Sequence, residues 1–346
     1  MRIEPTIAVV VPNRNDERYL ERCLRSVLDQ AVPPDELVVV DDASSDGSVP
    51  LIRRLIAGRA GARLIVNPVN LGVYGAINEG YRHTRSEYTL FLASNDFVLP
   101  GIFAHAKRAI AASPAGVGLW SAMAWFVDEE DRPLRLHASP VVSVRDAFLA
   151  PQRCHELAIR HGNWFTGGTL VYRRGALEEA GGFHDRYMGL SDLFTALAVA
   201  VRHGAAYSPV PLCAIRRHAE SYLIRTLADA GRLEDILGRV REQGLRTEPR
   251  LFTPEFWSRT VQRLRFASIR TTGGATLEAI AEASAEPVRG ALRRAARFLP
   301  QSWRRARVVA AFAILRPFDL LPSLWSRALG WLFVRSRHRW PVPPAL

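Results

Sequence analysis

The sequence has few cysteines and no leader-like segment at its start. Its 346 residues include only Cys23, Cys154 and Cys213, which have neither the number nor the spacing of a disulfide framework or a zinc site. This usage favours a reducing compartment. Residues 1–15 contain no basic segment followed by an apolar core and a small-residue cleavage site, so we expect no secretory signal.

Long apolar runs are also missing. The longest apolar stretch, 308–325, is interrupted by Arg316, Pro317, Asp319 and Pro322, whereas a bilayer core requires about 20 nearly uncharged residues in a row. We therefore expect no transmembrane span. Since 48% of the residues are hydrophobic and 23% are charged, the composition is that of a folded globular protein, which we expect in the cytoplasm.

Acidic residues are scarce in the last third of the chain. Residues 1–230 hold 25 basic and 25 acidic side chains, whereas residues 231–346 hold 21 and 9, so the whole net charge of +12 lies there. Within residues 287–346, 12 arginines accompany a single acid, Asp319. The tail therefore favours an anionic partner.

The first 100 residues alternate short apolar runs with amphipathic segments. Each apolar run is too short for a helix and is typical of a buried parallel strand, and each amphipathic segment is long enough for a crossover helix. The predicted strands are 7–11, 37–40, 63–66 and 88–92, and the predicted helices are 17–30, 49–58 and 75–85. This is a doubly wound α/β pattern, in which ligands bind at the carboxyl ends of the strands.

The pattern after residue 100 is less regular and ends in helices. We predict helices at 102–112 and 192–203, and strands at 117–123, 170–172 and near 211–215. From residue 221 onward the pattern is almost entirely helical, with breaks at glycines and prolines. The predicted fold class is therefore α/β, with a mostly parallel sheet flanked by helices and a mostly helical C-terminal region.

Acidic side chains follow two of the predicted strands. Asp41 and Asp42 come directly after the second strand, where paired carboxylates need donors such as the imide N–H of a nucleobase. Alternatively, they only begin a turn before a helix that Ser44 or Asp46 caps. Asp96 follows the fourth strand. It is either a cap or a ligand for Mg²⁺ or Mn²⁺ that substrate phosphates also hold.

Several short motifs occur in a characteristic order along residues 6–222. They are VPNRN (11–15), VDDAS (40–44), NLG (70–72) with NEG (78–80), EYTLFL (87–92), ND (95–96) before Pro100, GGFHD (181–185), LSD (190–192), and RRH (216–218) with Ser221. In this order they resemble the motifs of a family-2 inverting glycosyltransferase with a GT-A fold. The resemblance implies a GT-A catalytic domain over 1–222, with a nucleotide-sugar half at 1–100 and an acceptor half at 101–222. A helical, basic region follows at 223–346.

The resemblance also implies an activity and a nucleotide site. The activity is inverting transfer of a sugar from a nucleoside-diphosphate sugar, here a UDP-sugar, to a glycan or lipid-linked acceptor in surface polysaccharide biosynthesis. Pro12 and Arg14 match the positions that embrace the base, where the family usually has an aromatic residue in place of Arg14 and a guanidinium plane can stack instead. Asp42, with Asp41 beside it, matches the carboxylate that binds the uracil N3–H.

Metal binding is implied for the segment after the fourth strand. Asp96 matches the last aspartate of the DxD-type motif, which binds Mn²⁺ or Mg²⁺ at the diphosphate. Asn95 falls where an aspartate usually contacts the ribose, and Ala93 replaces the first aspartate of the commonest version. His218 matches a histidine that approaches the diphosphate or the metal, or is an ordinary surface or core residue.

Catalysis is assigned by the resemblance to Asp192, the base that takes the proton of the acceptor hydroxyl. Ser191 stands where a glutamate is frequent in the family. The alternative is that Asp192 only caps the apolar helix that follows.

Acceptor contacts in relatives fall at the segment that includes Trp164, Thr166, Gly167 and Gly168. Here too a structural role is the alternative, with the tryptophan in the core and the glycines in a tight turn. The segment QRLRF (262–266) is similar to the QxxRW motif of processive synthases, but we interpret it as part of an amphipathic helix.

The basic tail, 288–340, combines arginines with large aromatic residues at helical spacing. This composition favours peripheral binding to an anionic membrane surface, on the inner face of the cytoplasmic membrane. A helical bundle that packs its aromatics on the catalytic domain is the alternative, and nucleic acid is disfavoured because no helix-turn-helix or zinc pattern is present. The residues are Arg289, Arg293, Arg294, Arg297, Arg304, Arg305, Arg307, Phe298, Trp303, Phe312, Phe318, Trp325, Trp331 and Phe333.

Two other functions compete with sugar transfer. The replacement at Ala93 leaves open a catalytically silent sugar-nucleotide or glycan-binding protein with the same fold. A nucleotidyltransferase would share a related sheet, but it requires a glycine-rich, lysine-bearing phosphate loop after the first strand. The sequence there is PNRN (12–15).

Overall fold

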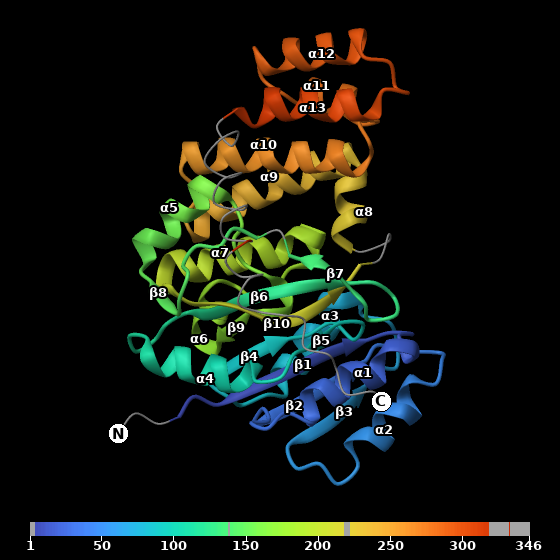
Figure 1. Cartoon of the computed structure of the whole chain (residues 1–346), viewed down its shortest axis with the longest axis vertical. Coiled ribbons are helices and arrows are strands. Elements are labelled where there is room, and N and C mark those ends of the chain that lie inside the picture. Colours follow the sequence, from blue (N-terminus) through green and yellow to red (C-terminus); the bar gives the residue numbers. More distant parts are fainter. Residues whose placement is uncertain (1–3, 138, 218–221, 318–331, 333–346) are drawn as a thin grey trace.

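The computed structural model describes residues 4–137, 139–217, 222–317 and 332. A ten-stranded mixed sheet has the order β3-β2-β1-β4-β9-β6-β10-β5, with β7 beside β6 and β8 beside β10. In Figure 1 this sheet crosses the lower half of the molecule, α9 and α10 lie above it, and α11–α13 form the far end. The strands are β1 (Ile7–Asn13), β2 (Glu36–Asp41), β3 (Ala62–Val66), β4 (Tyr88–Phe91), β5 (Phe97–Val98), β6 (Leu119–Val127), β7 (Pro133–Leu136), β8 (Ala147–Leu149), β9 (Val171–Arg173) and β10 (Ala205–Arg216).

The helices cover both faces of the sheet. One face carries α1, α2 and α4, whose apolar side chains pack on the buried residues of β1, β2 and β4. The other face carries α3, α5, α6 and α7. The helices are α1 (Glu17–Leu28), α2 (Ser48–Ile56), α3 (Gly72–Arg82), α4 (Ile102–Ala112), α5 (Pro151–His161), α6 (Arg174–Glu179), α7 (Ser191–His203), α8 (Tyr222–Ala228), α9 (Ala230–Thr247), α10 (Pro254–Thr271), α11 (Leu277–Glu282), α12 (Val288–Phe298) and α13 (Arg304–Leu315).

The first half of the sheet is parallel, as the sequence predicts. β1 pairs in parallel with β2 and β4, and β2 pairs in parallel with β3. β1 and β2 are almost fully buried, which is the pattern of strands covered by helices on both faces. The carboxyl ends of these strands therefore meet at one edge.

The second half of the sheet is mixed. β9 runs antiparallel between β4 and β6, whereas β10 runs parallel to β6. The predicted strands at 117–123, 170–172 and 211–215 correspond to β6, β9 and β10, and β10 begins six residues before the predicted strand. The predicted α/β class, with helices on both faces of the sheet and a helical C-terminal region, is confirmed.

The C-terminal helices fall into two packing groups. Side chains of α8, α9 and the first half of α10, including Leu233, Leu237 and Phe256, belong to the same core as α5 and α7. The second half of α10, including Phe266 and Ile269, forms a separate core with α11, α12 and α13. The division of the chain at residue 222 stays a prediction. Of the basic tail, residues 318–331 and 333–340 lie outside the described residues.

The QRLRF segment lies in α10, so its interpretation as helix is confirmed. Buried Arg263 donates from its guanidinium to the carbonyl oxygens of Ala158, Ile159 and Arg160 at the end of α5. A cation at these carbonyls compensates the negative end of the helix dipole. Among the described helices, none combines the length and apolarity that a membrane crossing needs.

Candidate active site

Asp41 joins the ends of β1 and β2. Its buried carboxylate accepts hydrogen bonds from the Asn13 side-chain amide on Oδ2 (2.8 Å) and from the Ser44 backbone N–H on Oδ1 (3.0 Å). Both carboxylate oxygens thus already bind donors within the protein. Asp41 shapes the edge of the site, and its contact with a donor ligand stays a prediction.

Asp42 lies beside Asp41 and is tied to the beginning of α3. It is 3% exposed, and its Oδ1 accepts hydrogen bonds from the Asn67 side-chain amide (2.8 Å) and the Leu71 backbone N–H (2.9 Å). Neither aspartate caps α2. Gly47 occupies the N-cap position of α2, and neither Ser44 nor Asp46 makes a side-chain capping bond there, although Asp46 Oδ1 accepts from the Ser48 N–H at 3.1 Å.

The loops after β1 and β2 are cross-linked to each other. The Asn15 backbone N–H donates to Ser44 Oγ (3.0 Å), and Asn15 Oδ1 accepts from the Ser45 N–H (2.8 Å). Asn15 and Ala43 both have positive φ angles, 53° and 58°. Residues other than glycine rarely adopt such angles, and those that do often lie at functional sites. Pro12 is half-buried in this region, and Arg14 is exposed.

Asp96 follows β4 and is held from behind by Arg216. Its Oδ1 accepts a hydrogen bond from the Arg216 backbone N–H at 2.8 Å. The buried Arg216 guanidinium donates to Asn95 O (3.0 Å) and Asp128 O (2.7 Å), and it pairs with Asp131. Sequence reasoning noticed Arg216 only as part of a motif. Its positioning role emerges from these four contacts.

The electrostatic environment of Asp96 suits a cation. Burial raises the pKa of the Asp96 carboxyl to about 7; the hydrogen bond and charge of Arg216 oppose this increase, and the negative charge of Asp16 adds to it. Asp96 nevertheless keeps accessible surface. Asp16, which accepts a hydrogen bond from the Ser94 hydroxyl at 2.6 Å, was not predicted as a site residue.

A divalent cation would relieve the cost of charging Asp96 beside Asp16. Within the described residues no group of three or more potential ligand side chains gathers. Mg²⁺ usually needs only one or two carboxylates plus substrate phosphates, so the donor set fits such an ion. His218 lies outside the described residues.

Asp192 lies in the first turn of α7, and its carboxylate does not cap the helix. Leu190 occupies the N-cap position, and no side-chain capping bond is present. Surrounding protein raises the pKa of Asp192 to about 6 by desolvation, which a hydrogen bond from Tyr74 partly opposes. The residue itself is exposed. A carboxylate that is enclosed by protein but accessible to solvent is the arrangement a general base requires.

Tyr74 connects Asp192 to the nucleotide side of the site. Its hydroxyl lies 2.8 Å from Met188 O and 3.3 Å from Asp192 Oδ1, and its single proton is shared between these two acceptors. Tyr74 belongs to the first turn of α3, three residues after Leu71, whose N–H binds Asp42. One helical turn therefore joins Asp42 to Asp192. No motif predicted this tyrosine as a site residue.

The predicted acceptor segment is mostly buried. Trp164 and Thr166 are each 1% exposed. A Cβ on Gly168 would lie 2.6 Å from Cys213 Sγ, so close packing explains this glycine. Gly167 is exposed. Contact between these residues and an acceptor stays a prediction.

Comparison with known proteins agrees with this geometry. The family model described as "Glycosyl transferase family 2" matches residues 8–181. An uncharacterized protein of Mycobacterium tuberculosis, MT1568, is 30% identical over 224 residues, which span 62% of this chain and 68% of that protein. The putative teichuronic acid biosynthesis glycosyltransferase TuaG of Bacillus subtilis is 30% identical over 93 residues. That match spans 27% of this chain and 37% of TuaG, well under half the length of that relative.

Solved structures show the same fold at low sequence identity. Residues 1–349 of S. aureus TarS in complex with UDP-GlcNAc superpose with a TM-score of 0.60 at 14% identity and cover 91% of both chains. The mannosyltransferase PcManGT of Pyrobaculum calidifontis, in complex with GDP-Man and Mn²⁺, superposes with a TM-score of 0.56 at 23% identity. That superposition covers 93% of this chain and 88% of the mannosyltransferase.

Proposed function

Because this chain belongs to glycosyl transferase family 2, we propose that it transfers a sugar from a UDP-sugar to a glycan or lipid-linked acceptor in surface polysaccharide biosynthesis, with inversion at the anomeric carbon. One observation carries the proposal. The first turn of α3 binds Asp42 through Leu71 and Asp192 through Tyr74. Asp42, which would bind the nucleobase, and Asp192, which would act as the general base, thus lie at the same edge of the sheet.

On the donor side, Asp42 would accept the uracil N3–H on Oδ2, since both of its hydrogen bonds to the described residues end on Oδ1. Arg14 is exposed and can stack on the base beside Pro12. Asn95, fixed through its carbonyl oxygen by Arg216, would contact the ribose. The N–H···O bond at Asp42 would distinguish uracil from bases without an imide proton.

Asp96, with Asp16 nearby and His218 as the third candidate, would hold Mn²⁺ or Mg²⁺ at the diphosphate. Such a cation supplies Lewis-acid stabilisation of the negative charge that develops on the leaving diphosphate. The support within the chain is the carboxyl of Asp96, whose pKa is raised by burial and by the neighbouring Asp16 charge.

Asp192 would take the proton of the acceptor hydroxyl while the acceptor oxygen attacks the anomeric carbon. A carboxyl with a pKa of about 6 is mostly ionised at neutral pH, and it is a stronger base than an ordinary aspartate. The Tyr74 hydroxyl orients the carboxylate. Oδ2 of Asp192 makes no hydrogen bond to the described residues, and the exposed surface of this side chain leaves room for an incoming alcohol.

The central experiment compares Asp192→Asn with Asp235→Asn, an exposed aspartate of α9 that pairs with Arg239. Loss of a general base should slow sugar transfer by about 10²–10⁴-fold, whereas binding of UDP, measured by thermal shift, should stay unchanged. Asp235→Asn should keep both properties. Equal transfer by the wild type and Asp192→Asn would remove Asp192 from the mechanism.

A thermal-shift screen with UDP, GDP, dTDP and CDP, each with and without Mn²⁺, tests the nucleotide and the metal, because ligands that bind the native state raise its apparent stability. We expect the largest shift with UDP and Mn²⁺. Nucleotide binding without any transfer or donor hydrolysis by the wild type would instead support a silent binding protein.

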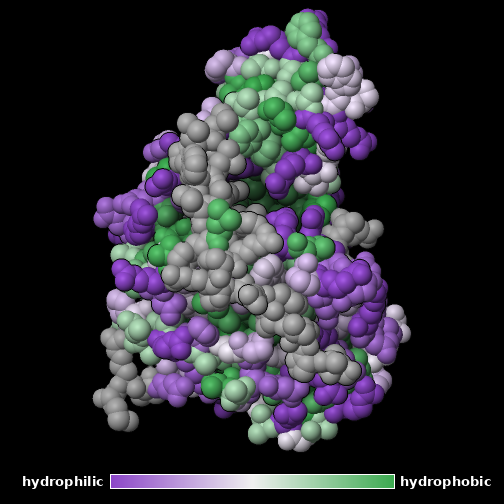
Figure 2. Space-filling view, in the orientation of Figure 1, coloured by the Kyte–Doolittle hydropathy of each residue, from purple (hydrophilic) through white to green (hydrophobic). Residues whose placement is uncertain are grey.

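We further propose that α12 and α13 bind the anionic inner surface of the cytoplasmic membrane. Phe298 and Trp303 are 72% and 60% exposed at this end of the molecule. Figure 2 shows hydrophilic and hydrophobic residues side by side at the end that α11–α13 form. Four arginines nearby are exposed and have no acidic partner among the described residues: Arg294, Arg297, Arg304 and Arg305. Each cation near such a surface contributes about 1 kcal/mol.

The membrane proposal is tested by changing these four arginines to glutamine in the full chain. Co-sedimentation with vesicles that contain phosphatidylglycerol should fall strongly, and vesicles of phosphatidylcholine alone should bind neither protein. A fourfold arginine-to-glutamine variant at Arg53, Arg82, Arg153 and Arg186 serves as the control for charge. Equal sedimentation of the wild type and the α12–α13 variant would refute the membrane proposal.

A further inference from the structure

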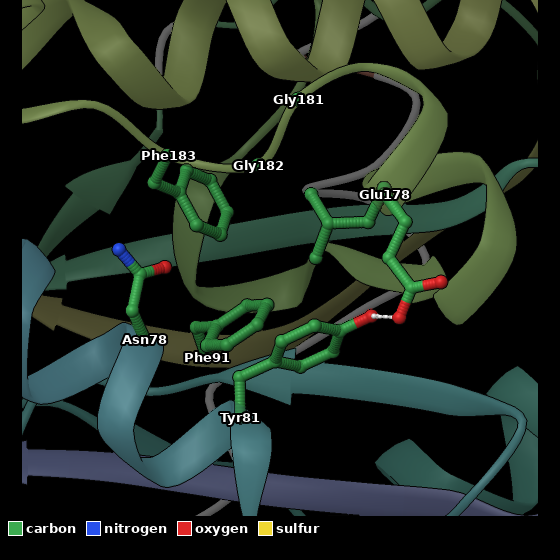
Figure 3. Close-up of a pocket in the computed structure, with 8 residues that line it drawn as sticks. Asn78, Tyr81, Phe91, Glu178, Gly181, Gly182 and Phe183 are labelled. Carbon is green, nitrogen blue, oxygen red and sulfur yellow. Dashed lines mark hydrogen bonds between the residues drawn. The ribbon is translucent and has the colours of Figure 1, made fainter.

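A pocket of about 290 Å³ lies beside the candidate active site, between α3 and the segment that follows α6. Asn78 and Tyr81 from α3, Phe91 from β4, Glu178 from α6 and Phe183 line it (Figure 3). None of these side chains has a role in the transfer proposed above. The pocket is therefore a candidate site of its own.

The apolar part of the pocket consists of three aromatic rings and the side chain of Leu177. Phe91 and Phe183 meet edge to face, with ring centroids 5.0 Å apart, and Tyr81 packs against Phe91 at 6.0 Å. Figure 3 shows the three side chains grouped around the same space. Such rings offer flat apolar surfaces with fixed orientation.

The polar part consists of an amide and a carboxylate. The Asn78 side chain makes no hydrogen bond within the described part of the chain and is partly exposed. Glu178 accepts a hydrogen bond from the Tyr81 hydroxyl on Oε1 at 3.1 Å, and its ion pair with Arg174 uses the same oxygen. Donor and acceptor groups are thus available next to the aromatic rings.

The remaining wall is bare backbone. Gly181 and Gly182 have φ angles of +84° and +70°, a backbone conformation that residues other than glycine rarely adopt. A Cβ on Gly182 would meet nothing within 4 Å. A ligand can therefore approach the main chain closely at this turn.

The position of the pocket ties it to the candidate base. The Phe183 ring stacks on Tyr74 with a centroid separation of 6.1 Å, and the Tyr74 hydroxyl donates to Asp192. One aromatic ring therefore belongs both to the pocket and to the group of side chains that orients the base. A ligand in the pocket would therefore contact a ring that packs on the residue orienting the candidate base.

We propose that this pocket binds a saccharide unit of the acceptor glycan. Sugar rings combine apolar C–H faces with hydroxyl groups, and a site for them needs aromatic surfaces together with a few polar groups. A carboxylate among the lining residues opposes a nucleoside diphosphate, and the amide and carboxylate would remain unsatisfied beside an alkyl chain. The assignment rests on the proposed glycosyl transfer and names the part of the protein that recognises its acceptor.

Three variants of the full chain test the assignment. Asn78→Ala removes the free amide, Asn78→Trp fills the pocket, and Glu178→Gln removes the charge but keeps an acceptor for Tyr81. Glu156→Gln on α5, which pairs with exposed Arg153, is the matched control for charge. Saturation-transfer NMR with cellobiose, chitobiose and mannobiose measures saccharide binding, and thermal melting checks that each variant is folded.

We expect at least one disaccharide to bind the wild type and Glu156→Gln, and to bind Asn78→Ala and Glu178→Gln at least tenfold more weakly. Asn78→Trp should not bind it. Failure of all three disaccharides to bind the wild type, or equal binding by all variants, overturns the assignment.

Hydrolysis of UDP-sugar, measured in parallel, separates this assignment from the proposed function. The pocket variants should hydrolyse the donor at close to the wild-type rate, because among the described residues no hydrogen bond or ion pair joins Asn78 or Glu178 to the residues assigned to the donor. Absence of donor hydrolysis in the wild type would count against the proposed function alone.

Discussion

Arg216 and Asp96 are joined through the main chain, since the backbone N–H of Arg216 donates to Asp96 Oδ1 at 2.8 Å. The side chain of the same arginine fixes the surroundings of that bond by its contacts with Asn95 O, Asp128 O and Asp131. Its guanidinium also lies 4.3 Å from the centroid of the Tyr19 ring in α1. Two loops and a helix thus converge on one buried cation behind the candidate metal ligand.

We predict that Arg216→Lys lowers both the free energy of unfolding and the affinity for UDP with Mn²⁺. A lysine cannot reproduce the fork of donors, so the buried pair with Asp131 and the bonds to two carbonyl oxygens are lost. Urea unfolding should show a loss of about 3 kcal/mol. The neighbouring Arg217 is exposed, and Arg217→Lys should change the unfolding free energy by less than about 0.5 kcal/mol. Equal effects of the two substitutions would contradict the positioning role.

The pH dependence of transfer should follow Asp192. With saturating Mn²⁺, which would keep Asp96 ionised, kcat/KM should increase with pH through about 6 and level off above it, since burial raises the pKa of Asp192 to about 6. The Tyr74 hydroxyl lowers this pKa by bonding the carboxylate, so Tyr74→Phe should move the acidic limb of the profile to higher pH. Tyr88→Phe removes a core hydroxyl that bonds Val117 O instead. Its profile should coincide with that of the wild type.

Titration of Asp192 should make the unfolding free energy change with pH in the direction opposite to kcat/KM. Its folded pKa of about 6 lies above the ordinary value of 3.8, so the folded protein binds more protons than the unfolded chain between these pH values. The unfolding free energy therefore falls as pH rises through about 6. Asp192→Asn stays neutral and should be more stable than the wild type at pH 8, by less than about 1 kcal/mol after solvent screening. At pH 4 the two proteins should unfold at the same urea concentration.

The metal prediction concerns Asp96. Asp96→Asn removes the charge that would bind the cation but keeps an oxygen to accept the Arg216 N–H. A ligand at one hundred times its Kd stabilises a protein by roughly 2.7 kcal/mol. We expect Mn²⁺ to increase the stabilisation of the wild type by UDP, and to leave the stabilisation of Asp96→Asn by UDP unchanged. The measurement is the thermal shift with UDP in Mn²⁺ and in EDTA. A Mn²⁺-dependent shift of equal size in the variant would exclude Asp96 as a ligand.

The sequence predicted the nucleotide half of the fold well, because its strands are continuous apolar runs separated by amphipathic helices. The four parallel strands and three helices of the first 100 residues all occur, and α3 begins at Gly72 rather than at the predicted Gly75. β5, β7 and β8, with two, four and three residues, were missed, because hydrophobic periodicity cannot be detected in segments this short. The helices α5, with 11 residues, and α6, with six, were also not predicted.

The candidate site was predicted less completely, for a different reason. Motif order identified Asp42, Asp96 and Asp192, which carry charges that a family resemblance can match. It did not identify Tyr74 or Asp16 as site residues, because their roles depend on contacts 118 and 78 positions away along the chain. Such contacts become visible only when the helices are placed on the sheet.

Helix α10 contributes Phe256 to the catalytic core and Phe266 with Ile269 to the core of α11–α13. Its 18 residues form a rod about 27 Å long. In Figure 1 this rod lies across the molecule, between α9 and α13, so if α12 and α13 rest on a membrane, the layer that α10 forms sets a fixed height of Asp192 above the lipid. The enzyme would then prefer glycans whose growing end lies at this same distance from their membrane anchor.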